Sequence, residues 1–296
     1  MTKPKAYLGI DVGGSSLRMM LQVGEDPRSD ILSEPIPSTY SDFLALVQSM
    51  VITLGQTQLT GVGCGLPGAT DFETPLFMPA LPWLEGKALR YDLASMLGAE
   101  VTLGVDGHFT LLAEAFEGAA KGHSSSALVA VGTGIGGAIM INGRIWRGHT
   151  GTAGSWGWIP LSGARGQDGH GAFELMGSGS ALSRRAAGLV PPMDAVDLIE
   201  AARTGIEFAL REVNEFALVL GEGLAVVASA FDPGILIIGG GLSAAVDVLS
   251  EGIRKSLLQC ASPNTRDVLV VPAALGPTAG VVGALLAARS EESLWL

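Results

Sequence analysis

Phosphate chemistry is first suggested by a glycine-rich turn near the N-terminus, DVGGSS, which begins at Asp11. Glycine has no Cβ, so the backbone N–H groups of Gly13 and Gly14 can approach phosphate oxygens closely, and the hydroxyls of Ser15 and Ser16 add donors. The carboxylate of Asp11 can hold hydrated Mg²⁺, which prefers carboxylate, water and phosphate oxygens. An ordinary hairpin turn has the same pattern, so this segment alone leaves both interpretations open.

A second turn of this kind lies about half a chain later, GTGIGG from Gly132. Residues 6–23 and 127–142 share one pattern, an apolar run, a glycine-rich turn and a second apolar run, which is typical of a β-hairpin. The repetition favours two lobes with similar cores facing each other across a cleft. The backbone of Gly132, Thr133 and Gly134 could then bind phosphate from the second lobe. Neither turn is a Walker A loop or a dinucleotide fingerprint, because no Lys-Ser/Thr pair follows and the first turn leads into a strand.

Two further candidate sites follow predicted strands. Asp106 comes directly after the predicted strand Val101–Val105, at the sheet edge where open α/β proteins bind ligands. Phosphoryl transfer needs positioning, charge neutralisation and one base near the acceptor hydroxyl, and Asp106 fits that base, with a helix N-cap as the alternative. The turn Gly239-Gly240-Gly241 separates a predicted buried strand from a helix and suits a nucleotide on bare backbone, although a tight turn without function is the simpler interpretation.

The elements that must position these residues alternate between strand and helix, which indicates an α/β fold. Strands are expected over Thr60–Leu66 and Ile235–Ile238, and helices over Tyr91–Leu97, Phe109–Gly122, Ala172–Ala187, Gly205–Phe231 and from an N-cap at Ser243 to about Leu258.

The uncharged stretch Val268–Ala288 is long enough to span a membrane, but its Pro and Gly residues favour a short buried strand, a turn and a helix.

Composition narrows the classes of partner. The 296 residues suit two lobes, and a net charge of −11 would repel nucleic acid and anionic lipid. ATP would be repelled at long range too, so a site for it must rely on local backbone donors and a bound cation. The two cysteines, Cys64 and Cys260, lie in apolar surroundings and are interpreted as core residues, and two cysteines exclude a disulfide framework. We therefore expect a reducing, cytoplasmic location.

With these motifs assembled, the chain resembles the ROK sugar kinases, the family of bacterial glucokinases within the hexokinase, actin and heat-shock ATPase superfamily. The resemblance runs in order over nearly the whole chain. It implies the two-lobed actin/hexokinase-like fold, a duplicated ribonuclease H-like α/β architecture with an interlobe cleft. The motifs that carry it are GIDVGGSSLR (9–18), GLPGATD (65–71), GVDGHFTLLAE (104–114), VGTGIGGAIMINGRIWRG (131–148), FELMGSGSAL (173–182), ILIIGGGLS (235–243) and LGPTAGVVGALLAA (275–288).

The resemblance also implies a role for each matched residue. The catalytic base would be Asp106, which would also contact substrate, and Asp11 would assist Mg²⁺ binding, through water. The N-terminal lobe would comprise residues 1–110 with a C-terminal helix at about 277–296, and the C-terminal lobe residues 111–276. ATP would be bound by Asp11, Gly13, Gly14, Ser15, Ser16, Gly132, Thr133, Gly134, Gly240 and Gly241, and the sugar by Pro67, Gly68, Asp106, Ser155, Trp158 and Glu174.

Departures from the family pattern bear on the substrate. Where the family has Asn before the catalytic Asp this chain has Val105, and Ala80 stands where an Asn commonly precedes Leu-Pro. The family's Glu-x-Gly-His is SWGW from Ser155, so several polar groups that grip a hexose are missing. The exposed faces of aromatic rings stack on sugars, and Trp158 is therefore expected to line the pocket.

Three functions fit these observations. The first is an ATP-dependent kinase that phosphorylates a hydroxyl of a monosaccharide or sugar derivative, and the second is a nucleotide- or sugar-binding pseudokinase or sensor without transfer. The third is a transcriptional regulator, which in this family carries an N-terminal helix-turn-helix. The first strand is expected near Ala6 and the charge is −11, so we expect no nucleic-acid or membrane partner. Intact Asp11 and Asp106 favour the kinase, and a homodimer is usual in the family.

The first testable prediction is independence from zinc. The family's zinc-binding His and three Cys are replaced, in our alignment, by Trp158, Arg165, Gln167 and Ala172, none of which is a usual zinc ligand. Metal analysis of the purified protein should show no stoichiometric zinc, and a chelator should leave the melting temperature unchanged. One zinc per chain would show that this alignment is wrong.

Overall fold

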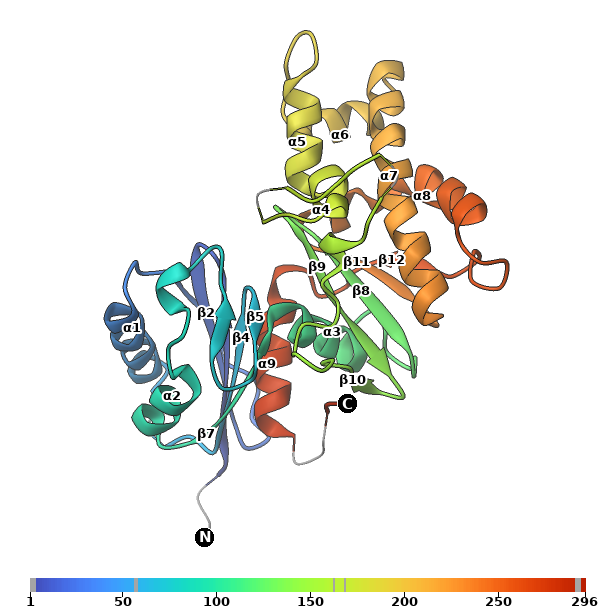
Figure 1. Cartoon of the computed structure of the whole chain (residues 1–296). Coiled ribbons are helices and arrows are strands. Elements are labelled where there is room, and N and C mark those ends of the chain that lie inside the picture. The colour runs from blue at the N-terminus through green and yellow to red at the C-terminus, as the bar shows by residue number, and fades with distance from the viewer. Residues whose placement is uncertain (1–3, 56–57, 162, 168, 291–293) are drawn as a thin grey trace. The chain divides into compact units, whose positions relative to one another are not determined.

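The structure is a computed structural model that describes residues 4–55, 58–161, 163–167, 169–290 and 294–296. The chain forms two compact units (Figure 1). The first comprises residues 1–117, 144–153 and 277–296, and the second comprises residues 118–143 and 154–276. The C-terminal segment therefore belongs to the same unit as the N-terminal strands, and each unit is described separately below.

The first unit is built on a five-stranded sheet with the order β3-β2-β1-β4-β7. Strands β1, β4 and β7 run parallel, and β2 returns antiparallel from β1, as the first predicted hairpin requires. All six residues of β4 are buried, as is usual for a strand covered on both faces. The strands are β1 (Ala6–Val12), β2 (Ser16–Val23), β3 (Leu32–Pro35), β4 (Gly61–Leu66) and β7 (Glu100–Val105), and a separate small hairpin joins β5 (Ala69–Thr70) to β6 (Pro75–Phe77).

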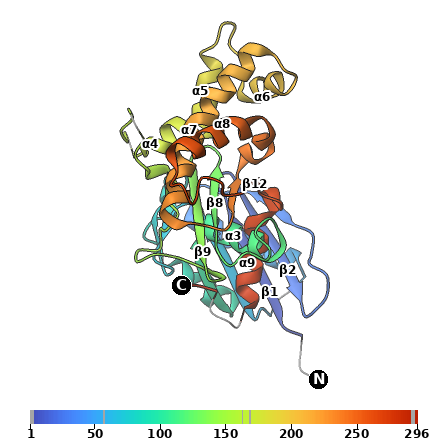
Figure 2. The same ribbon diagram turned by 90° about the vertical axis from the view of Figure 1, so that its right-hand side faces the viewer.

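Helix α9 (Ala279–Arg289) packs against β1 and β4 and beside α3, and Figure 2 shows it next to both β1 and α3. Close approach depends on Gly63, because a Cβ there would lie 2.0 Å from the carbonyl oxygen of Ala284. Glycine at this position lets the backbone of the helix lie directly on the strand. The other helices of this unit are α1 (Tyr40–Thr53), η1 (Pro82–Leu84), α2 (Leu89–Leu97) and α3 (Asp106–Glu117), and η4 (Gly276–Thr278) precedes α9.

The loop after β10 (Arg144–Ile145) is fixed by the C-terminal residues of the same unit. Ile145 forms an isolated bridge with Trp295. The guanidinium of Arg147 lies between two rings, 4.0 Å from the ring centre of Phe72 and 3.8 Å from that of Trp295. Cation–π attraction on both faces holds this side chain, and with it the loop that leads towards Ser155.

The second unit repeats the hairpin-and-parallel-strand pattern. Its strands follow the order β9-β8-β11-β12, with β8 and β9 antiparallel and β8, β11 and β12 parallel. The hairpin β8–β9 carries the second predicted phosphate turn. These strands are β8 (Ser126–Val131), β9 (Ile135–Ile141), β11 (Leu236–Gly239) and β12 (Val270–Pro272).

Helices of the second unit include the segment FELMGSGSAL (173–182). The longest is α7 (Glu207–Phe231), which packs along α8 and ends just before Asp232-Pro233, as predicted. In the described part of the chain it is the one helix long and apolar enough to span a membrane, yet its apolar face is buried in this unit. The others are η2 (Trp156–Trp158), α4 (Ala172–Gly177), α5 (Gly179–Ala187), α6 (Ala195–Arg203), η3 (Gly241–Ala245) and α8 (Val246–Cys260).

Three local expectations were wrong. The single helix expected over Ala172–Ala187 is broken at Ser178, whose extended backbone and side chain cap a new helix, because Ser favours caps over helix interiors. Ser243 does not cap α8; it lies inside η3, and α8 begins without a side-chain cap. Cys260 is exposed rather than buried, since it ends α8 on the solvent side, whereas Cys64 is buried in β4 as expected.

The second prediction concerns the packing of α9 on the sheet. Gly63→Ala should destabilise the protein by about 1–3 kcal/mol or more, because overpacking against a backbone carbonyl forces strand and helix apart. Gly188→Ala is the control, since a Cβ there would meet its nearest atom at 3.4 Å with a negative φ. Thermal unfolding of both variants measures the difference. Equal stability of the Gly63 variant and wild type would refute the packing described here.

Candidate active site

The carboxyl ends of the parallel strands in the first unit bring two acidic residues to one edge of the sheet. Asp11 in β1 pairs with Gly65 in β4, and the last residue of β4 pairs with Val105 in β7, so Asp11 and Asp106 flank the same end of β4. A Cβ on Gly65 would lie 3.7 Å from the Cα of Asp106. Ligands of open α/β sheets bind at this edge.

Asp106 is the first residue of α3, directly after β7. Its Oδ1 accepts a hydrogen bond of 2.6 Å from the backbone N–H of Gly107, so it does stand at the helix start that the cap interpretation expected. Close packing around the carboxyl, and next the nearby charge of Asp11, raise the pKa of Asp106 to about 7, against the lowering effect of the Gly107 bond. A carboxylate with this pKa can accept a proton near neutral pH.

Asp11 lies beside a cation, Arg18, that was not predicted from the sequence. The side chain of Asp11 is 14% exposed, and a guanidinium nitrogen of Arg18 lies 3.7 Å from its Oδ2. Burial raises the pKa of Asp11, and the charge of Arg18 opposes that shift. Arg18 also donates to the carbonyl of Pro277, 3.1 Å away, which ties the first hairpin to the segment before α9. Its position opposite Asp11 in the β1–β2 register is the signal that could have identified it.

The first glycine-rich turn is a tight hairpin with an exposed tip. Gly13 N–H donates to the carbonyl of Ser16 at 2.8 Å, and Gly14 and Ser15 are exposed. A Cβ on Gly14 would lie 3.3 Å from the methyl group of Ala80, the position where the family pattern has Asn. The turn therefore presents backbone groups at its tip, as expected for a phosphate-binding turn.

His108 follows Asp106 closely in sequence but is enclosed by protein and is a weak base. Its side chain is buried, and Nε2–H donates to the carbonyl of Ala153 at 3.0 Å. Burial lowers the pKa of His108 to about 4, so the ring is neutral at neutral pH. We assign His108 to holding the loop that ends at Ala153.

In the second unit, the predicted phosphate turn and the predicted adenosine turn are neighbours. Gly132 N–H donates to the carbonyl of Gly134 at 3.0 Å, and the carbonyl of Gly132 accepts from Gly179 N–H at 2.7 Å. Gly240 has a φ of +73°, and a Cβ there would lie 2.5 Å from the carbonyl oxygen of Val131. Glycine is thus required at Gly240 for both backbone angle and space.

Both carboxylate oxygens of Glu174 in α4 accept hydrogen bonds, and one of these bonds comes from the predicted phosphate turn. Its Oε2 accepts from Ile135 N–H at 2.8 Å, and its Oε1 accepts from Nδ1–H of His170 at 2.5 Å. The Glu174 side chain is 22% exposed, and that of His170 is 56% exposed. His170 was missed from the sequence, because it lies outside α4, ahead of the N-cap Gly171, and no periodic pattern pairs it with Glu174.

The two tryptophans of η2 have different environments. Trp156 is buried, its indole N–H donates to the carbonyl of Leu128 at 2.7 Å, and its ring meets Phe231 edge-on at 5.3 Å. Trp158 is 58% exposed, and Ser155 before the helix is exposed as well. Trp156 therefore anchors the loop, which leaves the ring of Trp158 available for a ligand.

The predicted site residues fall into two half-sites, one in each unit. The first unit holds Asp11, Gly13, Gly14, Ser15, Ser16, Pro67, Gly68 and Asp106, and the second holds Gly132, Thr133, Gly134, Ser155, Trp158, Glu174, Gly240 and Gly241.

Comparison with known proteins identifies the family. Residues 7–291 match the model of the ROK family. The chain belongs to the ROK family. It is 32% identical to a glucokinase of Streptomyces coelicolor over 97% of this chain and 98% of that protein. It is also 32% identical to an N-acetyl-D-glucosamine kinase of Pectobacterium atrosepticum over 80% of this chain and 84% of that protein.

The fold is shared with solved ROK structures. A ROK glucokinase from Streptomyces griseus, crystallised with glucose and AMPPNP, superposes with a TM-score of 0.79 at 28% identity, over 96% of this chain and 99% of that one. The predicted actin/hexokinase-like α/β fold is thereby confirmed. Among the described residues, no group of three or more His, Cys, Asp or Glu side chains could hold a metal ion, so the zinc experiment remains the test of that expectation.

The third prediction follows from the raised pKa of Asp106. Between about pH 4 and pH 7 the folded protein keeps a proton that the unfolded chain loses, so the contribution of Asp106 to stability falls as pH rises through this window. Asp106→Asn removes that dependence. The variant should therefore be more stable than wild type at pH 8, by about 1 kcal/mol or more, with a smaller difference at pH 5.

Urea unfolding of wild type and Asp106→Asn at both pH values measures this difference in stability. The effects of all other titrating groups cancel in the comparison, because both proteins contain them. If the difference in unfolding free energy between wild type and Asp106→Asn is the same at pH 5 and at pH 8, Asp106 titrates as an ordinary solvated carboxyl.

Proposed function

We propose that this ATP-dependent sugar kinase transfers the γ-phosphate of ATP to a hydroxyl of a monosaccharide or sugar derivative, with Asp106 as the base. The observation that carries the proposal is the closely packed carboxyl of Asp106 at the sheet edge, with a pKa raised to about 7 by burial and by Asp11. An acceptor hydroxyl is a weak nucleophile that must be aimed at the phosphate. A carboxylate in hydrogen-bond reach can orient it and take its proton as the new P–O bond forms.

The two glycine-rich turns and Asp11 fit ATP and Mg²⁺. A Cβ on Gly132 or Gly241 would meet no atom within 4 Å, so the backbone there is open to a ligand. Gly13, Gly14, Ser15, Ser16, Thr133 and Gly134 would bind phosphates, and Gly240 and Gly241 would border the adenosine. The carboxylate of Asp11 is a hard oxygen donor of the kind that Mg²⁺ prefers, and the ion would neutralise phosphate charge when bound. Asp11 would hold it through water.

The acceptor site would combine polar contacts with one aromatic face. Glu174 is oriented by Ile135 and His170, so its carboxylate would accept a bond from a substrate hydroxyl without having to reorganise. Trp158, 58% exposed, would stack on the apolar face of a sugar ring. Pro67, Gly68 and Ser155 would complete the pocket. Polar groups of the family pattern are replaced at Val105 and Ala80. We therefore propose that the substrate is either a sugar derivative or glucose.

The location, oligomeric state and partners of the enzyme are proposed from its composition and its family. We propose a cytoplasmic homodimer that acts on a small molecule, with no nucleic-acid or membrane partner. A charge of −11 opposes binding to nucleic acid and to anionic lipid. Residues 1–110 with about 277–296 would act as one lobe, and residues 111–276 as the other.

The fourth prediction tests the proposed transfer. Purified protein with Mg-ATP should phosphorylate at least one member of a panel of hexoses, amino sugars, N-acetylated sugars and polyols, seen as ADP release and a product one phosphate heavier. For that acceptor, Asp106→Asn should lower kcat by about 10²–10⁴-fold, because it removes the general base. ATP affinity by calorimetry should barely change, since both phosphate turns stay intact.

Two results would contradict this account. If ATP binds but no acceptor is phosphorylated, the protein is a nucleotide- or sugar-binding pseudokinase or sensor. If Asp106→Asn keeps more than about half of the wild-type kcat, well inside the range that base removal should exceed, Asp106 is only the first residue of α3. The acceptor rate should also rise with pH through about 7, where Asp106 ionises.

A further inference from the structure

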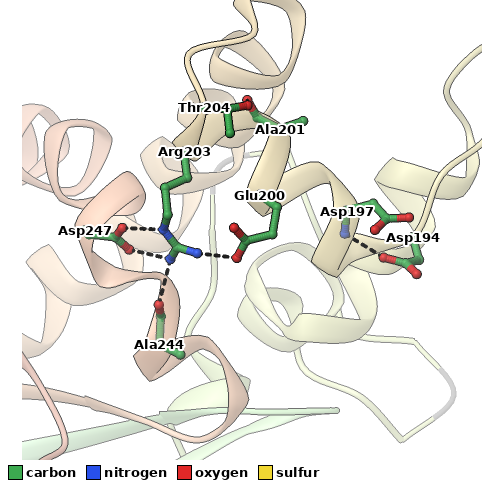
Figure 3. Close-up of polar contacts among 8 residues, drawn as sticks. All are labelled: Asp194, Asp197, Glu200, Ala201, Arg203, Thr204, Ala244 and Asp247. Carbon is green, nitrogen blue, oxygen red and sulfur yellow. Dashed lines mark hydrogen bonds and ion pairs between the residues drawn. The ribbon is translucent and has the colours of Figure 1, made fainter.

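A cluster of charged side chains joins helix α6 to the turn that follows β11 (Figure 3). Arg203, the last residue of α6, donates from Nε and from one terminal nitrogen to the two carboxylate oxygens of Asp247, at 2.7 and 2.9 Å. The same terminal nitrogen donates to the carbonyl of Ala244 at 2.9 Å, and the other donates to Glu200. One guanidinium thus connects α6, the backbone of η3 and the first turn of α8.

The turn that receives these bonds is largely exposed. In η3, Gly241 and Ala244 are exposed, and Ala245 is the one buried residue. Gly240 N-terminal to it is also exposed and has a φ of +73°. Glycine-rich backbone of this kind loses much conformational entropy when it is ordered, so side-chain contacts from outside the turn have a large effect on its position.

Helix α6, which carries Arg203, is itself held in place by contacts within the second unit. Asp194 caps its N-terminus by accepting from Asp197 N–H at 2.7 Å, and the chain leaves its C-terminus through Gly205, at φ +85°. Its inner face is buried against neighbouring helices of the second unit. The guanidinium of Arg203 is therefore presented from an anchored element, with its planar fork matched to the carboxylate of Asp247.

Hydrogen bonds connect Arg203 to Gly240 through the backbone of Ser243 and Ala244. Ala244, which Arg203 holds, adjoins Ser243, and Ser243 N–H donates to the carbonyl of Gly240 at 3.1 Å. Gly240 in turn lies on the carbonyl of Val131, at the start of the phosphate turn. The bond to Arg203 chiefly lowers the pKa of Asp247, so the pair stays ionised at neutral pH.

We propose that Arg203 is a positioning residue for the adenosine part of ATP. It does not touch the reacting atoms; it holds the backbone of η3 so that Gly240 and Gly241 present a fixed surface to the base and ribose. This inference rests on the proposed function, in which these glycines border the adenosine. It adds a residue on a different helix, outside every motif by which the sequence resembles the family.

The fifth prediction is that Arg203→Ala raises the KM for ATP by about two- to fivefold. This range corresponds to the coupling free energy that is typical of an exposed ion pair. The KM for the sugar acceptor and kcat should stay at wild-type values, because the half-site with Asp106 and the Glu174 contacts are unchanged. Arg203→Lys should also raise the KM for ATP, since a lysine keeps the charge but cannot bond a carboxylate and a carbonyl with one planar fork. Calorimetry with adenosine and with inorganic triphosphate should show weaker adenosine binding only.

Arg185→Ala is the matched control. Arg185 in α5 has a side chain 29% exposed, against 35% for Arg203, and it pairs with Glu212 and Glu215 in α7. This variant should lose thermal stability to a similar degree and keep the wild-type KM for ATP. If Arg185→Ala raises that KM equally, or if Arg203→Ala leaves it unchanged, the positioning role is refuted.

Failure of the proposed function gives a different result. A wild type that neither binds nor turns over ATP would overturn the proposed function and the role of Arg203 together. An active wild type with unaltered Arg203 variants would overturn the role of Arg203 alone. If Arg203→Ala does not accumulate as folded protein, Arg203→Lys decides between these outcomes by the same KM comparison.

Discussion

The proposed chemistry of this protein depends on keeping a carboxyl group crowded by protein at the end of a sheet. Asp106 is placed there because β7 ends at Val105 and α3 begins at once, and the parallel pairing of β1, β4 and β7 brings Asp11 to the same edge. Burial disfavours the charge and the neighbouring carboxylate repels it, and both effects raise the pKa of Asp106 to about 7. The same crowding that would make Asp106 a useful base is a cost to the folded state at neutral pH, a conflict typical of active sites.

The surrounding fold supports this arrangement through backbone-to-backbone packing. Gly63 lets α9 lie on β4, and Gly283 lets the same helix approach α3, where a Cβ would meet the carbonyl of Phe109 at 1.8 Å. Because α3 starts at Asp106, the position of that helix fixes the carboxyl. The second unit uses the same close packing at Gly240, which rests on Val131 beside the predicted phosphate turn. The high glycine content therefore reflects close packing at the site as well as flexible turns.

The sequence was sufficient to predict those parts that follow from local patterns. The hairpins, the strand before Asp106 and the ROK resemblance could be derived, because apolar periodicity and glycine-rich turns are encoded by neighbouring residues. Partners distant in sequence could not be derived from periodicity: Arg203 meets Ala244, and Arg147 lies between Phe72 and Trp295, only because tertiary folding brings them together. Caps were missed for a similar reason. Ser178 begins a new helix and Ser243 does not, although both are serines next to helical residues.

The most direct test of the central claim is a titration of the Asp106 carboxyl itself, followed by carbon NMR of the side chain in protein labelled at aspartate and assigned with Asp106→Asn. The account predicts a midpoint near pH 7 in the wild type. In Asp11→Asn the midpoint should fall, because the repulsion is gone, yet stay above the ordinary value for aspartate, because burial is the larger cause. A midpoint near 4 in the wild type would contradict the account, since Asp106 would then be an ordinary solvated carboxylate rather than a base tuned by its surroundings.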